Sequence, residues 1–511
     1  MKKFTFLFLS LFLCSGSFSQ NLRYINNSFN QVDTLEDVEY ARADFLNNKI
    51  ALLAEYNIHD GENKTENRPL YMDIFMPHAD TVTKRPAIIF AHSGAFLIGS
   101  RKADDMIAFC DSFARRGYVT ATIDYRMGMG ATVSRFLGIP INIKIEYSNG
   151  YRAAYRAGQD ARAAIRYLKH NAEEYGIDTS KVYFAGSSAG GILGLYNLYN
   201  DKPQEFTEAV FSEPSLGSLD TIGEQGYGGK ANAVVSMWGA VQDTKYIENE
   251  STPVFLIHGT ADPIVPFKKG IPLDSIIPEN PVLSFTMPET YGSYCVDTAL
   301  TNRNIYHETY FVDGGIHELY GVDTGEFYED GPNQYWDTIQ NKMSQFYFKL
   351  FKPEAVIGYY MNNLEFIFYD ESAEPAYSFW DFGDGSSATG EIASHTYNQK
   401  GIYNVRLTTC NQNMACDTVS TNIAAGIIDN LAEAKFNEIK IYPNPVKNQI
   451  NVLGIDDDFD AQIYDLTGRL YFTKMNIQNN TIDISGLQNG IYFIKISSSN
   501  HSVLRKFFKV N

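Results

Sequence analysis

The chain of 511 residues lacks an excess of basic side chains, and it lacks a long apolar run beyond its first residues. Lys and Arg number 42 against 60 Asp and Glu, which gives a formal net charge of −18. Nucleic acids and anionic membrane surfaces bind basic footprints, so this balance argues against both partners. No later run approaches the roughly 20 apolar residues that a transmembrane helix needs. We expect an acidic, soluble surface.

Cysteine is also scarce, with five residues in the whole chain. No spacing of Cys and His is typical of a zinc site, and we expect neither metal nor cofactor. Cys410 and Cys416 flank a five-residue segment that is typical of a hairpin loop, and we predict that they pair. Whether Cys110 and Cys295 pair is left open. Disulfides are permitted if the chain is exported.

The first 20 residues are typical of a secretory signal. Two lysines precede the apolar run Phe4–Cys14, whose 11 residues are too short to cross a bilayer. Small and polar residues follow, and we place cleavage after Gln20. A lipoprotein signal ending at Cys14 is the alternative, but the bulky Leu13 before it favours simple cleavage.

Residues 36–350 alternate between strand-like and helix-like segments. Several strand candidates are continuous apolar runs, as expected for strands buried on both faces. They are Pro86–Ala91, Tyr118–Ile123, Val182–Ala185, Ala233–Trp238, Pro253–Ile257 and Tyr306–Val312. A helical pattern covers Ala153–Tyr175, and Leu70–Phe75 alternates like an antiparallel edge strand. We predict a mostly parallel sheet with helices on both faces, within a domain of residues 21–352.

After Pro353 the helical periodicity ends, and short alternating segments lie between Gly, Asn and Asp turns. This pattern predicts two small β-sandwich domains, residues 355–425 and 437–511, joined by the linker Ala424–Phe436.

The sequence Gly186-Ser187-Ser188-Ala189-Gly190 follows the apolar run Val182–Ala185 and precedes a second apolar segment. Strand, then G-x-S-x-G, then helix is the pattern of a nucleophile elbow. Small residues are needed on both sides of the serine because strand and helix pass close together there. We predict that Ser188 is a nucleophile, although five residues alone are a weak signal.

An acid and a base follow Ser188 in the order Ser, Asp, His that α/β-hydrolases use. Asp262 lies on the loop after an apolar strand, and His317 lies on a Gly-rich loop after a later strand. We predict that Asp262 orients His317, and that His317 is the base. The rival bases are His258, which precedes Asp262, and His307, which begins a strand. The rival acids Asp313 and Glu318 are too close to His317 in sequence.

The loop after an earlier strand is expected to supply oxyanion donors through backbone N–H groups. Ile88–Phe96 ends in small residues that permit close approach, about one hundred residues before the elbow. Gly94 and Ala95 are the candidates, together with Ala189 directly after the nucleophile. An ordinary strand-to-helix turn is the alternative.

Residues 36–350 therefore resemble an α/β-hydrolase carboxylesterase of the group that includes feruloyl, acetyl and hormone-sensitive-lipase-like esterases. His92–Phe96 resembles the H-G-G-G-F motif of this group, and Asp124-Tyr125-Arg126 resembles its D-Y-R. Further matches are the segment Gln159–Arg166, the elbow, and the run from His258 to Asp262. The resemblance implies an acyl-enzyme on Ser188 and an ester substrate. Ser93 and Ala95 depart from the triple glycine and leave the choice of donors open.

The two tail segments resemble known extracellular modules. Tyr377–Ser386, His395–Tyr397 and Gly401–Leu407 resemble a PKD domain, an Ig-like sandwich, with Trp380, Phe382, Tyr397 and Tyr403 as aromatics of its core and corner. Ile441–Val446, Ile463–Arg469, Leu487–Tyr492 and the ending Lys506–Val510 resemble the C-terminal sorting domain of the Bacteroidetes type IX secretion system. This second resemblance implies the secretion machinery as a partner, and a secreted or surface-attached protein.

The sequence thus predicts a secreted serine carboxylic ester hydrolase acting on polymer-derived esters, such as acylated polysaccharide or polyester. A serine peptidase of the prolyl-oligopeptidase kind and a non-catalytic adhesion protein are the alternatives. Two insertions, Met127–Tyr151 and Pro272–Asn304, either shape the acyl pocket or elaborate the surface. The second carries Phe285, Tyr291 and Tyr294.

Overall fold

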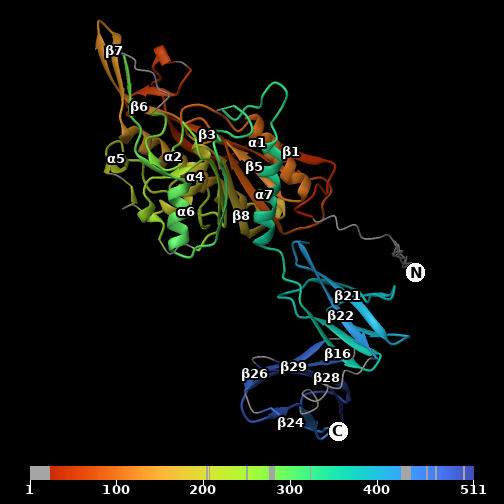
Figure 1. Cartoon of the computed structure of the whole chain (residues 1–511). Helices are drawn as coiled ribbons and strands as arrows, with labels where there is room; N and C mark the ends of the chain where they lie inside the picture. The colour runs from red at the N-terminus through yellow and green to blue at the C-terminus, as the bar shows by residue number, and fades with distance from the viewer. Residues whose placement is uncertain are drawn as a thin grey trace, which may run out of the picture. The chain divides into compact units, whose positions relative to one another are not determined.

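The computed structural model describes residues 23–53, 55–202, 205–206, 208–248, 251–274, 282–322, 324–426, 439–455, 458–465, 469–498 and 501–510. The expected signal segment, residues 1–20, lies outside the described residues, and so does most of the linker expected between the tail domains. The chain divides into two compact units, Met1–Leu350 and Phe351–Asn511 (Figure 1).

An eight-stranded sheet forms the centre of the first unit, with the strand order β1-β3-β5-β4-β8-β9-β11-β15. β3 pairs antiparallel with β1 and with β5, and the other neighbours pair in parallel. Every residue of β4, β5, β9 and β11 is buried, as expected where helices cover both faces. The strands are β1 (Val32–Leu46), β3 (Thr65–Pro77), β4 (Arg85–Ala91), β5 (Val119–Ile123), β8 (Ile177–Ser187), β9 (Val234–Met237), β11 (Val254–Gly259) and β15 (His307–Val312).

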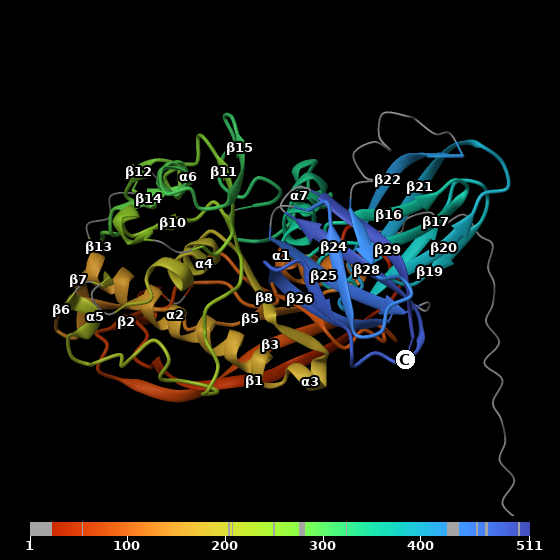
Figure 2. The ribbon, with the colours of Figure 1, turned by 90° about the horizontal axis from the view of Figure 1, so that it is seen from below.

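Helices cover the two faces of this sheet (Figures 1 and 2). On one face, Tyr183 of β8 stacks on Tyr347 of α7 with ring centroids 4.9 Å apart. The next residue, Phe184, points to the opposite face, where it contacts α4 at Gly194. α1 packs on the α7 face through Phe109, and α2 packs on the α4 face. The helices are α1 (Asp104–Arg116), α2 (Tyr147–His170), α3 (Ala172–Tyr175), α4 (Ala189–Tyr199), α5 (Glu208–Phe211), α6 (Ser293–Asn302) and α7 (Tyr335–Lys349).

Two smaller sheets each include at least one strand from the two insertions. Within Met127–Tyr151, β6 and β7 form a β-hairpin that joins the four-stranded sheet β13-β7-β6-β2, and the other sheet has the order β10-β14-β12. The strands are β2 (Ile58–Asp60), β6 (Met129–Phe136), β7 (Ile139–Ile145), β10 (Ala240–Val241), β12 (Lys269–Gly270), β13 (Leu283–Phe285) and β14 (Thr290–Gly292). The main sheet, its helices and this hairpin form the α/β-hydrolase fold that the sequence predicts.

The second unit contains two antiparallel sandwiches. The first pairs the sheets β16-β17-β20 and β19-β18-β21-β22, and the second pairs β23-β24-β27 and β26-β25-β28-β29. The strands of the first are β16 (Ile357–Asn362), β17 (Glu365–Asp370), β18 (Tyr377–Asp381), β19 (Ser387–Thr389), β20 (Ile392–Thr396), β21 (Gly401–Cys410) and β22 (Cys416–Ala425). Those of the second are β23 (Lys440–Tyr442), β24 (Gln449–Leu453), β25 (Phe459–Asp465), β26 (Leu470–Ile477), β27 (Thr481–Asp483), β28 (Gly490–Ser498) and β29 (His501–Lys509).

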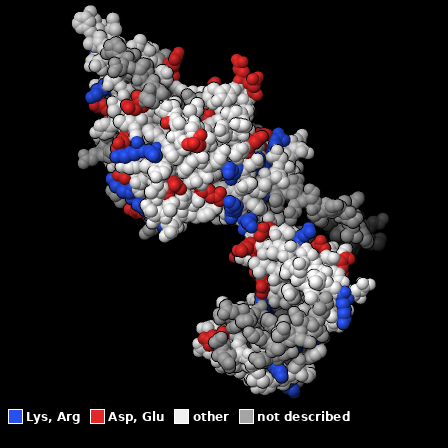
Figure 3. Space-filling model, in the orientation of Figure 1, with Lys and Arg blue, Asp and Glu red and all other residues white. Residues whose placement is uncertain are grey.

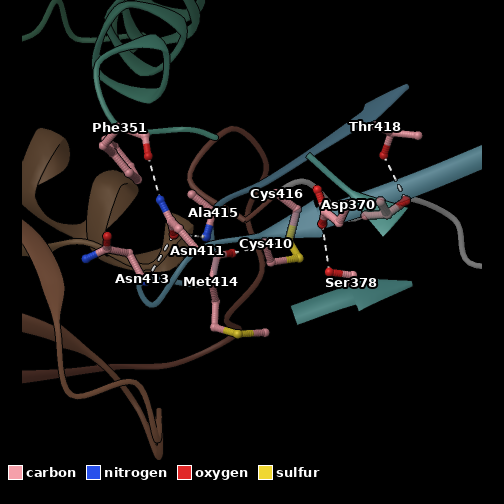
Figure 4. The surroundings of a disulfide bond; sticks show 11 residues. Phe351, Asp370, Ser378, Cys410, Asn411, Asn413, Met414, Ala415, Cys416 and Thr418 are labelled. Atoms are coloured by element: carbon pink, nitrogen blue, oxygen red, sulfur yellow. Dashed lines mark hydrogen bonds between the residues drawn. A yellow bond between two sulfur atoms is a disulfide. The ribbon is translucent and has the colours of Figure 1, made fainter. Parts of the chain in front are cut away.

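A disulfide between Cys410 and Cys416 closes the β21–β22 hairpin, as predicted (Figure 4). The side chain of Asn411 inside the loop donates to the carbonyl of Phe351 at 2.6 Å and accepts from the N–H of Ala415 at 3.1 Å. Trp380, Phe382 and Tyr397 lie in the sandwich core, whereas Tyr403 is half-buried. Cys110 and Cys295 are both free thiols.

The surface of the first unit carries charges of both signs. Figure 3 shows acidic and basic side chains interspersed on its visible face rather than gathered into one field. In the part of the chain that the structure describes, no helix is both long enough and apolar enough to cross a membrane.

Candidate active site

Ser188 lies at the sharp turn between β8 and α4. Its backbone is held at φ 54° and ψ −111°, a strained conformation for a residue other than glycine. A Cβ on Gly186 would come within 2.3 Å of the carbonyl carbon of Gly190, and a Cβ on Gly190 within 2.1 Å of the carbonyl oxygen of Ala91. Both glycines of the motif are therefore required sterically, as the pattern G-x-S-x-G predicts.

The loops that carry Asp262 and His317 leave adjacent strands. β11 and β15 are parallel neighbours and end together, with Gly259 opposite Val312. A Cβ on Gly259 would approach the carbonyl of Gly315 to 2.3 Å, so the two loops pass in close contact. The N–H of Ala261 also donates to the carbonyl of Gly315 at 2.9 Å. This pairing brings together two residues that lie 55 positions apart.

Ser188, His317 and Asp262 form one continuous chain of hydrogen bonds. The Oγ of Ser188 lies 2.9 Å from Nε2 of His317, and Nδ1 of His317 lies 2.7 Å from Oδ2 of Asp262. A carboxylate can only accept, so Nδ1 carries the proton and Nε2 accepts from the serine hydroxyl. The three side chains are almost fully buried.

A second histidine, His258, also contacts the carboxylate of Asp262. Its Nε2 lies 3.1 Å from Oδ2 of Asp262 and 3.1 Å from the carbonyl of Val265. Both partners are acceptors, so Nε2 carries a hydrogen, and Nδ1 forms a hydrogen bond with the hydroxyl of Ser293 at 2.8 Å. From the sequence, His258 is expected only as a rival base and as the start of the run that matches the esterase group. Its place four residues before Asp262, at the end of a strand, was the available signal.

Asp262 is ionised by this environment. Burial opposes its charge, but hydrogen bonds from His258 and His317 outweigh burial and hold the pKa of the carboxyl well below its usual range. Its Oδ1 accepts from the N–H groups of Ile264 and Val265 at 2.7 and 3.0 Å. The carboxylate can therefore stabilise an imidazolium at His317 without taking up its proton.

The other rival residues lie away from this chain. His307 pairs with Asp297 at 3.0 Å at the opposite end of β15 from His317. Asp313 accepts a hydrogen bond from the hydroxyl of Thr260 at 3.2 Å. Glu318 is buried behind the site, where it accepts from the hydroxyl of Ser187 at 3.4 Å.

The loop expected to bind the oxyanion has an unusual backbone. Gly94, Ala95 and Phe96 have φ values of 107°, 53° and 60°, three consecutive residues in the left-handed region. A Cβ on Gly94 would lie 2.1 Å from the carbonyl oxygen of Ile98, so this position requires glycine. Ala95 and Ala189 line the same pocket as Ser188, whereas Gly94 is not among its lining residues.

His92 supports this loop from beneath. Its ring stacks on Tyr125 with centroids 4.3 Å apart, and its Nδ1 donates to the carbonyl of Ser93 at 2.7 Å. The hydroxyl of Tyr125 donates to the carbonyl of His92 at 2.8 Å. Burial lowers the pKa of His92 to about 4, so the ring is neutral near pH 7. The histidine of the H-G-G-G-F-like motif thus holds the backbone in place.

An apolar pocket lies beside Ser188, and both insertions contribute to it. From Met127–Tyr151 it receives Gly150 and Tyr151. Phe285, Tyr291 and Tyr294 are not among its lining residues. The lining consists of Ala95, Phe96, Gly150, Tyr151, Ala154, Ser188, Ala189, Ile192, Tyr196, Ile264, Val265, Pro272, Leu273, Met287, Pro288 and Thr290. This environment suits an uncharged group next to the nucleophile. Among the described residues, no group of three His, Cys, Asp or Glu side chains could hold a metal ion.

Three family models match separate parts of the chain. Residues 72–137 and 139–222 match the BD-FAE family, residues 363–425 match the PKD domain, and residues 440–510 match the secretion system C-terminal sorting domain. The composite inferred from the motifs is therefore confirmed.

Curated relatives are similar to part of this chain. Fumonisin B1 esterase of Sphingopyxis macrogoltabida is 30% identical over 30% of this chain and 28% of its own length. Liver carboxylesterase 1 of Oryctolagus cuniculus is 31% identical over 31% and 27%. Acylamino-acid-releasing enzyme of Sus scrofa is 22% identical over 37% and 26%. The chain thus spans less than a third of the length of each. Among solved structures, esterase 2 of Thermogutta terrifontis is 18% identical and covers 60% of this chain and 94% of its own, with a TM-score of 0.38.

Proposed function

We propose that the protein is a secreted serine carboxylic ester hydrolase that works through an acyl-enzyme on Ser188. The observation that carries this proposal is the unbroken hydrogen-bond chain from Ser188 through His317 to the ionised Asp262. Two of the similar proteins are esterases by name. An adhesion protein would have no use for this buried and strained arrangement.

The proposed reaction follows from the atoms that face one another. Nε2 of His317 takes the Ser188 proton as Oγ attacks the ester carbonyl, and Asp262 stabilises the imidazolium. The oxyanion is held by N–H groups from Ala95 and Ala189, with Gly94 as the third candidate. His317 then gives its proton to the leaving alcohol. Water attacks the acyl-enzyme by the same route, releases the acid and restores Ser188.

Substrate and location follow from the tail modules. The match of residues 440–510 to a secretion sorting domain supports export by the type IX machinery and a secreted or surface-attached protein. An extracellular esterase meets esters before the cell has taken them up. We therefore infer a polymer-derived ester, such as a feruloylated or acetylated polysaccharide or a polyester.

A second candidate is hydrolysis of an aminoacyl amide. The similarity to acylamino-acid-releasing enzyme favours it, because that relative is aligned over more of this chain than the two esterases are. The same Ser188, His317 and Asp262 would serve, so the triad geometry does not separate the two reactions.

One assay separates these functions. Wild type and Ser188→Ala are given p-nitrophenyl acetate and an aminoacyl p-nitroanilide. We expect the wild type to hydrolyse the ester, and Ser188→Ala to lose at least a thousandfold in kcat. Faster turnover of the anilide would favour the peptidase, and turnover of neither would favour adhesion. Ester turnover that survives the substitution would refute the role of Ser188.

A further inference from the structure

The β6–β7 hairpin extends beyond the strands that flank it. Among the described residues, β2 pairs with Met129–Ala131 of β6 and β13 pairs with Ile143–Ile145 of β7, and neither pairing extends further. Residues 134–142 continue past both of these pairings as a two-stranded ribbon, which projects from the first unit (Figure 1). Two strands alone bury little apolar surface, so polar side chains would be expected at such a tip.

The tip is apolar instead. Phe136 is 65% exposed, Leu137 87%, Ile139 66% and Ile141 52%. These four side chains lie within six consecutive residues at the end of the ribbon. Single exposed apolar residues are ordinary, but a contiguous exposed group marks a surface that meets another apolar surface.

Leu137 adopts an unfavourable backbone conformation, and its side chain is exposed. It forms the two-residue turn with Gly138, and their φ values are 49° and 81°. Asn, Asp or Gly suits the first position of such a turn, and leucine is disfavoured in the left-handed region. The strain therefore indicates a role for the exposed leucine itself.

The base of the hairpin is firmly anchored. Arg156 of α2 donates to the carbonyl of Gly128 at 2.8 Å and pairs with the buried Glu62 at 2.8 Å. Glu62 in turn accepts from the N–H of Gly130 at 3.4 Å. These buried contacts fix the stem, so the tip is presented on a rigid support.

β7 of the stem and its partner strand β13 both lead into the walls of the pocket beside Ser188. β7 leads into the first turns of α2, where Gly150 and Tyr151 line the pocket. β13, which pairs with β7, leads to Met287 and Pro288, which line the pocket next to Gly150. The hairpin is therefore connected to the pocket walls through β7 and β13.

We propose that the tip, residues 136–141, inserts into the apolar face of a water-insoluble, uncharged ester and delivers the protein to its substrate. Arg135 at the tip is neutralised by Asp60 at 2.7 Å, and Lys144 of the stem pairs with Glu146. Paired charges on a chain of net charge −18 do not suit an anionic bilayer. Four side chains are also far fewer than the about 20–30 residues that each side of a standard protein interface contributes.

This inference rests on the proposed ester hydrolysis, and the experiment separates the two. The full chain carrying Ser188→Ala, which leaves the substrate intact, is mixed with tributyrin droplets, and the unbound fraction is measured after flotation. The tip variant adds Phe136→Ser, Leu137→Ser and Ile139→Ser to it. The control adds Leu52→Ser, another leucine of the same unit that is 64% exposed.

We expect the tip variant to lower the partition coefficient at least tenfold, because three exposed side chains lose their apolar contact, and the control to leave it unchanged. In the active protein, the tip substitutions should slow hydrolysis of droplets at least tenfold and change kcat/KM for dissolved p-nitrophenyl acetate by less than twofold. Equal adsorption of tip variant and control would overturn the inference. So would light scattering that shows a dimer lost in the tip variant, or tip-dependent binding to anionic vesicles but not to droplets. A failure of wild type on the dissolved ester would count against the proposed function alone.

Discussion

Asp262 accepts hydrogen bonds from two histidines and two backbone N–H groups, and all four favour its charged form. The side chain of His258 forms hydrogen bonds with Ser293, Asp262 and Val265 and not with Ser188. It is not among the residues that line the pocket. We therefore interpret it as a positioning residue. It holds the carboxylate in the orientation that fixes the proton of His317 on Nδ1.

Replacing His258 should lower turnover without altering substrate binding. A hydrogen bond to a charged group contributes about 1.5–3 kcal/mol, so we expect His258→Phe to lower kcat by roughly 10–100-fold with KM nearly constant. His258→Gln keeps a donor and should recover part of the loss. His307→Gln is the matched control, since His307 also pairs with an aspartate but at the far end of β15. Steady-state kinetics with thermal melts would check this, and a fully active, stably folded His258→Phe would contradict it.

Asp105 makes a separate prediction about stability. Burial raises its pKa to about 7, although Tyr320 and the N–H of Met106 donate to it. The folded chain therefore keeps a proton that the unfolded chain releases near pH 4. The stabilisation from this group is fully present below the unfolded pKa and is lost as pH rises through about 7.

The free energy of unfolding of wild type should therefore fall by on the order of 1–4 kcal/mol from pH 4 to pH 8 relative to Asp105→Asn. Denaturant titrations at the two pH values would measure the difference. Asp111→Asn on the same helix removes an exposed carboxylate and should behave like wild type. An identical pH response of Asp105→Asn and wild type would refute the buried proton.

The loop between β4 and α1 has three consecutive residues, Gly94 to Phe96, in the left-handed region. Its proposed role depends on this backbone conformation. Gly94→Ala should destabilise the protein by about 1–3 kcal/mol and lower kcat at least a hundredfold, because the loop must shift to avoid the carbonyl of Ile98. Ala95→Gly relieves strain at the neighbouring position and should retain activity. Melting temperature and kcat for the pair would test this. Equal activity of Gly94→Ala and wild type would show that the loop does not bind the oxyanion.

Some segments were predictable because their signals are local. Buried parallel strands appear as apolar runs, and the order of Ser188, Asp262 and His317 limits where the loops must meet. The start of α2 was not predicted: the helix begins at Tyr147, six residues before the expected start. Its capping contacts between Glu146 and Asn149 precede a glycine that interrupts the apolar periodicity. The role of His258 depends on a contact that exists only once β11 and its loop have folded.

The chain as a whole divides into two compact units, so we expect damage to one to leave the chemistry of the other intact. The disulfide closes a loop with a sequence separation of 6 in the second unit. Chain entropy then predicts that Cys410→Ser with Cys416→Ser lowers the stability of that unit by roughly 2 kcal/mol.

Ester turnover by this double variant should remain within twofold of wild type. Calorimetry of the full chain, with Cys295→Ser as a control that removes a free thiol, would show a shift of one transition only. If the double variant lost ester turnover together with the stability of the second unit, the two units would depend on each other.

The most direct test of the account is to locate the nucleophile by covalent labelling. The full chain is treated with a fluorophosphonate, which reacts with activated serines, and its peptides are sequenced by mass spectrometry. We predict one adduct, on Ser188, formed in step with complete loss of ester turnover, absent in Ser188→Ala and retained in Ser187→Ala. An adduct on another residue that accounts for the inactivation, or full activity after labelling of Ser188, would contradict the account.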